Sequence, residues 1–161
     1  MNPLLQKLRS QAPWLFDELR LEVTSYSYSE KYFGNSIVVL HSKDMKLRFV
    51  QDRGQILVDF EVPAEPGKWW SLYFLLDAIQ GSAPTPIFDL DGIVARLRQN
   101  LTGILEALGP GWSKTKQELE RRREERSQAL RRRKAQPVGR FRRFASMMRA
   151  TLRRFRSSTR P

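Results

Sequence analysis

The sequence lacks cysteine and has a single histidine among its 161 residues. A chain without cysteine forms no disulfide, no thiolate metal site and no cysteine nucleophile, and one histidine cannot build a histidine-rich metal cluster. The sequence also lacks a run of roughly 18 apolar residues, the length that a membrane-spanning helix needs. Its longest apolar run, residues 69–79, is shorter and contains Asp77, so we expect a buried helix there.

Signals for export and for cofactor binding are also missing. Lys7 and Arg9 fall where the apolar core of a secretion signal would lie. The motifs GxGxxG, GxSxG and the P-loop do not occur. We therefore expect a cytoplasmic, bacterial protein that uses no cofactor and is not an enzyme.

Charge is divided unevenly along the chain. The whole chain carries 29 Lys and Arg against 17 Asp and Glu, a net charge of +12. Residues 1–112 hold 11 basic and 13 acidic side chains, a net charge of −2, whereas residues 113–161 hold 18 basic and 4 acidic side chains, a net charge of +14. We predict a globular domain over residues 1–112 and a basic tail, partly helical or disordered, over residues 113–161.

Within residues 1–112, segments in which apolar residues have helical spacing are combined with segments in which they have strand spacing. A helix in two pieces is expected over residues 3–19, because Pro3 and Pro13 each suit a first helical position. Strands are expected over 21–28, 37–41, 45–50 and 56–62, and helices over 69–80 and from Asp89 or Asp91 to Leu108.

Together these elements predict an α+β fold. The strands are close in sequence and one side of each is apolar, which favours a four-stranded antiparallel meander with two helices packed on one face. Gly54 stands where a hairpin turn needs positive φ, and Gly109 and Pro110 are expected to end the last helix.

Candidate catalytic residues are few. His41 ends an apolar strand, and the sequence places no nucleophile or orienting carboxylate beside it. Asp89 and Asp91 lack the spacing of a calcium loop and are better explained as helix-capping carboxylates. An enzyme that uses carboxylate or tyrosine chemistry without a known motif remains a third hypothesis.

Aromatic residues crowd the loop after the first strand. Tyr32 and Phe33 lie beside Gly34 and Asn35, a plausible turn. Aromatic side chains dominate both cores and interfaces, so the crowding alone does not distinguish the two. The position of Tyr32 and Phe33 beside the turn favours a protein-binding loop formed by Tyr32, Phe33 and Asn35.

The tail has two parts, joined at residues 136–139. Residues 113–135 are almost free of apolar side chains and place glutamates three or four residues from arginines, as in a solvated helix. The cationic clusters of this part are candidates for anion binding, by lipid or phosphate: Arg121, Arg122, Arg123, Arg131, Arg132, Arg133 and Lys134.

The second part of the tail has an apolar stripe. At about 100° per residue, five side chains fall within an arc of roughly 80°. They are Phe141, Phe144, Met148, Leu152 and Phe155. The remaining surface of this predicted helix carries further candidate anion-binding residues: Arg140, Arg142, Arg143, Arg149, Arg153, Arg154 and Arg156.

Two partners compete for this basic amphipathic helix. The apolar stripe favours an anionic membrane surface or a partner groove. The excess of arginine over lysine, 15 to 3 in the tail, suits phosphates, and the phenylalanines suit stacking on unpaired bases of RNA or DNA. A helix that docks on the chain's own domain, or a disordered tail, is a further alternative.

The stretch from Phe33 to Phe60, FGNSIVVLHSKDMKLRFVQDRGQILVDF, resembles a pattern in small uncharacterised bacterial proteins. Some of these proteins are similar to immunity proteins of toxin systems. The resemblance covers under a fifth of the chain and implies a non-enzymatic cytoplasmic protein that binds another protein. We thus expect a non-catalytic binding module with a protein partner, located in the cytoplasm or at the inner face of the membrane, with an RNA- or DNA-associated protein as the alternative.

Overall fold

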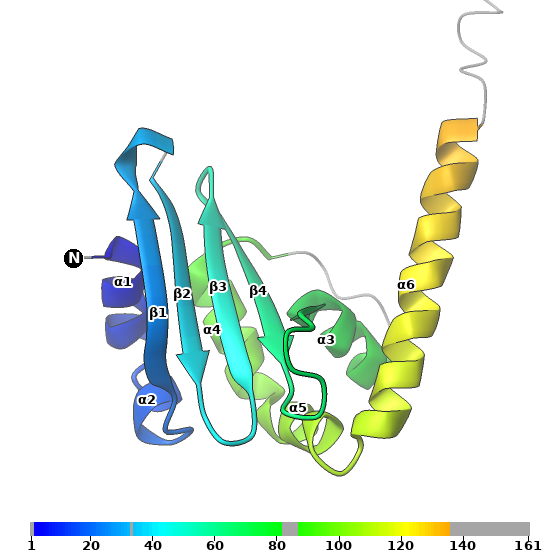
Figure 1. Ribbon diagram of the computed structural model, residues 1–161, viewed down its shortest axis with the longest axis horizontal. Helices are drawn as coiled ribbons and strands as arrows, with labels where there is room; N and C mark the ends of the chain where they lie inside the picture. The colour runs from blue at the N-terminus through cyan, green and yellow to red at the C-terminus, as the bar shows by residue number, and fades with distance from the viewer. Residues whose placement is uncertain (1, 33, 82–86, 136–161) are drawn as a thin grey trace, which may run out of the picture. The chain divides into compact units, whose positions relative to one another are not determined.

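The computed structural model describes residues 2–32, 34–81 and 87–135, with side chains as far as residue 132 (Figure 1). In chain order the elements are α1 (Pro3–Gln11), α2 (Trp14–Asp17), β1 (Glu22–Ser29), the short 3-10 helix η1 (Glu30–Tyr32), β2 (Asn35–His41), β3 (Lys46–Asp52), β4 (Gln55–Glu61), β5 (Trp70–Ser71), α3 (Leu72–Gln80), α4 (Leu90–Gln99), α5 (Leu101–Leu108) and α6 (Trp112–Ala135). The chain forms two compact units, residues 1–122 and 123–161, so the boundary falls within α6.

The described strands form one antiparallel sheet in the order β1-β2-β3-β4-β5. The α+β class and the antiparallel meander are thus confirmed, but the expected number of four strands is wrong. Trp70 and Ser71, which we expected in a helix, pair with Phe60 and Asp59 of β4. The loop that contains Pro63 and Pro66 turns the chain back along β4, and the helix begins only after this short pairing.

The expected helix from Asp89 or Asp91 to Leu108 is two helices, α4 and α5, separated at Asn100. The Asn100 side chain donates a hydrogen bond to the carbonyl of Arg96 at 2.9 Å and accepts one from Gln80 at 3.1 Å. An asparagine side chain that bonds to the preceding turn competes with the helical ladder, which explains the break.

One face of the sheet carries the core. The buried residues alternate along the three central strands, and they are Ser36, Val38, Leu40, Leu47, Phe49, Ile56, Val58 and Phe60. Helices α1 and α4 lie behind the sheet on the same side (Figure 1), α1 contacts β2, and α3 contacts β4 and β5. We call the other face the open face, because its side chains on these strands are exposed or partly exposed, except for that of Glu61.

The N-terminal helix is fixed to the sheet by a buried polar contact. Asn2 caps α1 by accepting from the N–H of Leu5 at 3.1 Å. It also donates to the Ser27 carbonyl at 2.8 Å and accepts from the hydroxyl of Ser36 at 2.8 Å. A break between α1 and α2 occurs at Ala12 and Pro13, which confirms the expected helix in two pieces.

The turn between β3 and β4 is a tight hairpin. Asp52 pairs with Gln55, and the two central residues, Arg53 and Gly54, have φ of 50° and 82°. Positive φ at both central positions is the geometry of a type I′ turn, which matches the right-handed twist of the strands. The glycine was expected from the sequence, whereas the left-handed arginine was not.

Candidate binding surfaces

Helix α6 begins inside the folded domain rather than after it. Trp112, its first residue, is buried and meets Trp70 edge to face at 5.8 Å and Phe60 at 6.3 Å between ring centroids. Leu119, two turns later, is also buried. Residues seven apart lie on the same side of a helix, so one stripe of α6 packs against the core although the segment is almost free of apolar residues.

The loop before β5 holds the first turns of α6 through charges. Lys116 forms an ion pair with Glu65, and Lys68 lies 3.4 Å from a carboxylate oxygen of Glu120. The hydrogen bond from Lys116 lowers the pKa of Glu65, and the same contact raises the pKa of Lys116. The Lys68 ammonium also lies 4.2 Å from the centroid of the Trp70 ring. Because these side chains are partly exposed, their contacts fix the position of α6 but add little to the free energy of unfolding.

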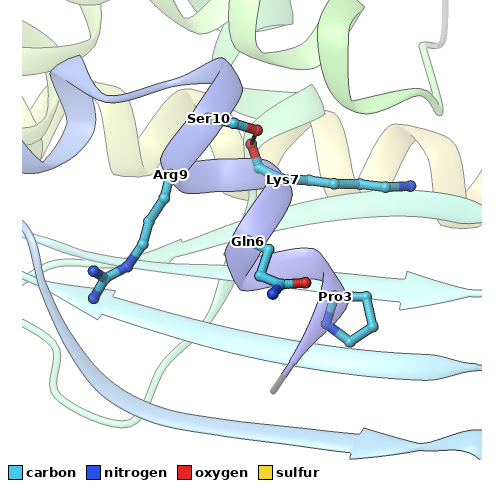
Figure 2. Close-up of a pocket in the computed structure, with 5 residues that line it drawn as sticks. All are labelled: Pro3, Gln6, Lys7, Arg9 and Ser10. Atoms are coloured by element: carbon cyan, nitrogen blue, oxygen red, sulfur yellow. Dashed lines mark hydrogen bonds between the residues drawn. The ribbon is translucent and has the colours of Figure 1, made fainter.

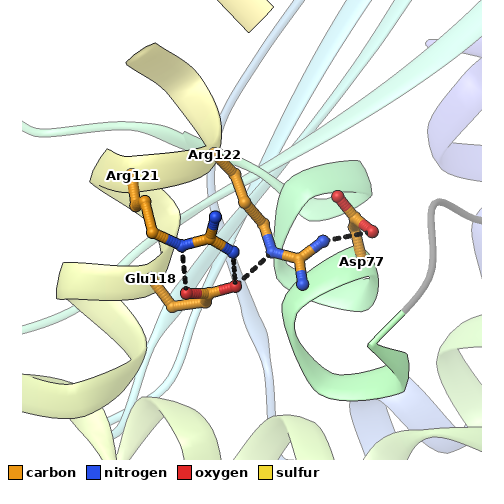
Figure 3. Close-up of polar contacts among 4 residues, drawn as sticks. All are labelled: Asp77, Glu118, Arg121 and Arg122. Carbon is orange, nitrogen blue, oxygen red and sulfur yellow. Dashed lines mark hydrogen bonds and ion pairs between the residues drawn. The ribbon is translucent and has the colours of Figure 1, made fainter. Parts of the chain in front are cut away.

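A second set of charges connects α6 with α3 (Figure 3). Nη1 of Arg122 lies 2.5 Å from Oδ1 of Asp77, and its Nε lies 2.6 Å from Oε1 of Glu118. Arg121 binds both oxygens of Glu118, at 2.8 and 2.6 Å. The Asp77 and Arg122 side chains are only 12% and 16% exposed. Hydrogen bonds from Arg121 and then Arg122 lower the pKa of Glu118 to about 2.

The cluster in Figure 3 contains two of the predicted anion-binding residues, Arg121 and Arg122. Arg121 and Arg122 are held by carboxylates of the chain itself. Arg123, Arg131 and Arg132 have exposed side chains on α6. Arg133 and Lys134 lie on α6 beyond the described side chains. The remaining candidates lie outside the described residues: Arg140, Arg142, Arg143, Arg149, Arg153, Arg154, Arg156 and the stripe of Phe141, Phe144, Met148, Leu152 and Phe155.

The open face of the sheet carries an apolar row followed by two charged rows. Ile37, Val50 and Leu57 lie opposite one another on β2, β3 and β4, and Ile37 and Leu57 are 38% and 49% exposed. In the next rows, Arg48 pairs with Asp59 at 2.7 Å and Lys46 with Glu61 at 2.6 Å.

The predicted protein-binding loop is only partly assembled. Tyr32 is 61% exposed at the end of η1, whereas Asn35 begins β2 and its side chain accepts from the N–H of Arg53 at 3.3 Å. Phe33 lies outside the described residues. Asn35 therefore supports the neighbouring hairpin turn rather than standing free for a partner.

The remaining candidates show no convergent site in the described part of the chain. His41 is exposed at the end of β2, opposite Glu22 and Lys46 in register. Asp89 caps α4 by accepting from the N–H of Gly92 at 2.7 Å, as expected. Among the described residues, no group of three or more His, Cys, Asp or Glu side chains is placed to hold a metal ion.

A shallow hollow of about 620 Å³ lies along the solvent side of α1 (Figure 2). Pro3, Gln6, Lys7, Arg9 and Ser10 line it. Figure 2 shows the two cationic side chains, Lys7 and Arg9, pointing away from each other, and Arg9 lies 5.6 Å from the ring centroid of Phe16. The hollow is the surface of one helix and brings no functional groups together.

Sequence reasoning missed how α6 is attached. The composition of the chain changes after Trp112, so Trp112 was assigned to the domain and Leu119 and Arg122 to the tail. Their spacing of seven and three residues nevertheless places all three on one face of a helix. It also missed the apolar row on the open face of the sheet, because that row depends on the pairing of strands.

No helix in the described ranges is both long enough and apolar enough to cross a bilayer. A search of family models, of curated proteins and of solved structures finds no match to this chain.

Proposed function

We propose that the protein is a non-catalytic binding module whose domain contacts a protein partner and whose basic C-terminal segment attaches it to an anionic membrane surface. The observation that carries this proposal is the distribution of charge beyond the anchored part of α6. From Ser127 to the end, the chain has 12 Lys and Arg and no Asp or Glu. The segment cannot neutralise these charges itself, so it favours an external polyanion.

The contacts of α6 separate anchoring from exposed arginines. Arg121 and Arg122 are occupied by Glu118 and Asp77, whereas Arg123, Arg131 and Arg132 extend into solvent. Each basic residue near an anionic leaflet contributes about 1 kcal/mol. Stable attachment to a membrane surface usually requires two kinds of contact. The arginines supply electrostatic attraction, and the predicted stripe of apolar residues supplies hydrophobic burial.

A membrane is favoured over nucleic acid because of the stripe. Two of its five members, Met148 and Leu152, are aliphatic. Aliphatic side chains gain free energy in the acyl region of a bilayer but do not stack on bases as aromatic rings do. The domain's protein partner is supported by the implied likeness to immunity proteins and by the exposed Tyr32.

The experiment compares full-length proteins on two kinds of vesicle, phosphatidylcholine alone and phosphatidylcholine mixed with phosphatidylglycerol. We expect co-sedimentation with the anionic vesicles only. Replacing Met148→Ser together with Leu152→Ser keeps the net charge and should lower partitioning at least about tenfold. The control is Leu130→Ser, which removes a 57% exposed leucine of α6 outside the stripe and should leave partitioning unchanged.

Two results would overturn the membrane proposal. One is equal partitioning of wild type and the double variant onto anionic vesicles. The other is absence of vesicle binding together with a shift of single-stranded RNA whose affinity falls steeply with salt. The second result would establish the nucleic-acid alternative.

A further inference from the structure

Among the described residues, strand β1 is the free edge of the sheet. It pairs there only with β2, and it stands at the end of the strand order. The opposite edge is covered, because β5 pairs with the end of β4 and the N–H of Ile56 donates to the Phe88 carbonyl at 2.8 Å. An uncovered strand presents a row of backbone donors and acceptors to any extended chain that approaches it.

Apart from a bulge near its start, β1 lacks the usual protection against such pairing. Proteins commonly guard edge strands with lysine, proline, inward charges, bulges or short length. β1 is eight residues long, has neither lysine nor proline, and its only charged residue is Glu22 at its start. A bulge lies between Val23 and Ser25. The segment from Ser25 to Ser29 then pairs with β2 without interruption, so five residues form a regular, uncharged edge.

Two tyrosines stand on this segment. Tyr26 and Tyr28 pair in register with Val38 and Ser36, whose side chains are buried on the helix-covered face. Opposed residues of neighbouring strands point to the same face, so the tyrosines lie on that face too. They are nevertheless 62% and 45% exposed, although Asn2 at the start of α1 donates to the carbonyl of Ser27 between them.

We propose that β1 pairs with β1 of a second copy of this chain, antiparallel, about a two-fold axis at Ser27. Ser27 is the midpoint of the uninterrupted segment, so this register pairs the largest number of regular residues. It sets Tyr26 against Tyr28 of the second copy twice, as cross-strand aromatic pairs, and Ser25 against Ser29 on the opposite face. A symmetric interface of this kind closes as a dimer.

A dimer would also present two basic tails, but the pairing of β1 does not depend on what those tails bind.

The absence of cysteine gives a direct test of the register. A single Ser27→Cys substitution in the full-length chain would lie opposite its own copy, at a Cα separation of about 4.5–5.5 Å that a disulfide can span. With diamide as oxidant, which takes up two hydrogens from the two thiols, we expect rapid formation of a covalent dimer. Gln55→Cys, an exposed position on β4, is the control and should cross-link at least about tenfold more slowly.

The same chemistry distinguishes this register from others. Ser25→Cys alone should not cross-link, because the two copies of residue 25 would lie about 13 Å apart along the strands. A mixture of Ser25→Cys and Ser29→Cys proteins should form a covalent heterodimer. Ser27→Lys should weaken dimerisation at least about tenfold by opposing like charges at the axis, with Gln55→Lys as its control.

Analytical ultracentrifugation of the wild-type chain is the second readout, and it requires no variant to fold. We expect a monomer–dimer equilibrium that shifts to monomer in Ser27→Lys. A wild-type chain that sediments as a monomer at all concentrations, or Ser27→Cys that cross-links no faster than Gln55→Cys, would overturn the proposal. Neither result would bear on vesicle binding by the tail.

Discussion

Nη1 of Arg122 lies 2.5 Å from Oδ1 of Asp77, and this ion pair joins α6 to α3. Both side chains are largely removed from solvent and have lost hydration. The attraction between the two charges compensates for that loss. Arg122 is also the last residue of the first compact unit. The pair therefore lies at the end of the part of α6 that belongs to the first unit.

Removing Asp77 should cost more stability than removing an exposed partner. We expect Asp77→Ala to lower the free energy of unfolding by about 2–3 kcal/mol, because it leaves Arg122 half-paired and poorly hydrated. Urea denaturation followed by tryptophan fluorescence measures this change. The control is Glu18→Ala, which breaks an exposed ion pair with Arg98 and should cost less than about 1 kcal/mol. Equal losses in the two variants would contradict the prediction.

Glu118 should make the stability of the protein sensitive to acid. Its pKa is lowered from the usual 4.5 to about 2 by hydrogen bonds from Arg121 and Arg122. A carboxyl whose pKa is lower in the folded state stabilises the fold above its unfolded pKa, and that contribution is lost as the pH falls. We therefore expect a loss of stability between about pH 4.5 and pH 2.

The variant Glu118→Gln should lose less stability over this range than the wild type does, because it has no carboxylate to protonate. Urea denaturation at a series of pH values measures the difference. Glu106→Gln removes the same charge from an exposed position on α5 and serves as the control. A Glu118→Gln curve that runs parallel to that of the wild type would show that this carboxylate does not govern the acid response.

Asn2 should be harder to replace than an ordinary helix cap. An exposed asparagine cap tolerates aspartate well, but here the Asn2 amide also donates to the Ser27 carbonyl at 2.8 Å. Asn2→Asp loses this donor and buries a charge, so we expect it to destabilise the protein by at least about 1 kcal/mol, as Asn2→Ala does. Thermal unfolding by circular dichroism tests this. If Asn2→Asp were as stable as the wild type, the helix cap alone would account for the contribution of Asn2 to stability.

The β3–β4 turn offers a stabilising substitution. Arg53 has a φ of 50°, a left-handed conformation that costs a residue with a Cβ about 1–2 kcal/mol. Asparagine tolerates this conformation and precedes glycine in the preferred type I′ turn. We expect Arg53→Asn to raise the free energy of unfolding by about 0.5–1 kcal/mol. Lys43→Asn, in the β2–β3 connection where φ is not positive, is the control and should give no gain.

Local signals in the sequence predicted most elements correctly. A β-branched run identified β2, and alternating apolar residues identified β3 and β4. Pro3 and Pro13 marked the two pieces of the N-terminal helix, and Asp89 capped its helix as expected. These signals work because each depends on neighbours within a few residues. The break at Asn100 was missed, because the hydrogen bond from Gln80 that supports it joins two separate helices.

The sequence by itself determined the α+β class, the order of the strand-forming segments along the chain and the concentration of positive charge after residue 112. These are properties of composition and short-range periodicity. Only the tertiary structure decided that α6 begins within the core, that Arg121 and Arg122 are bound to carboxylates, and that β1 is a free edge with two exposed tyrosines. Each of these depends on contacts between segments distant in sequence, and no local pattern encodes which segments will meet.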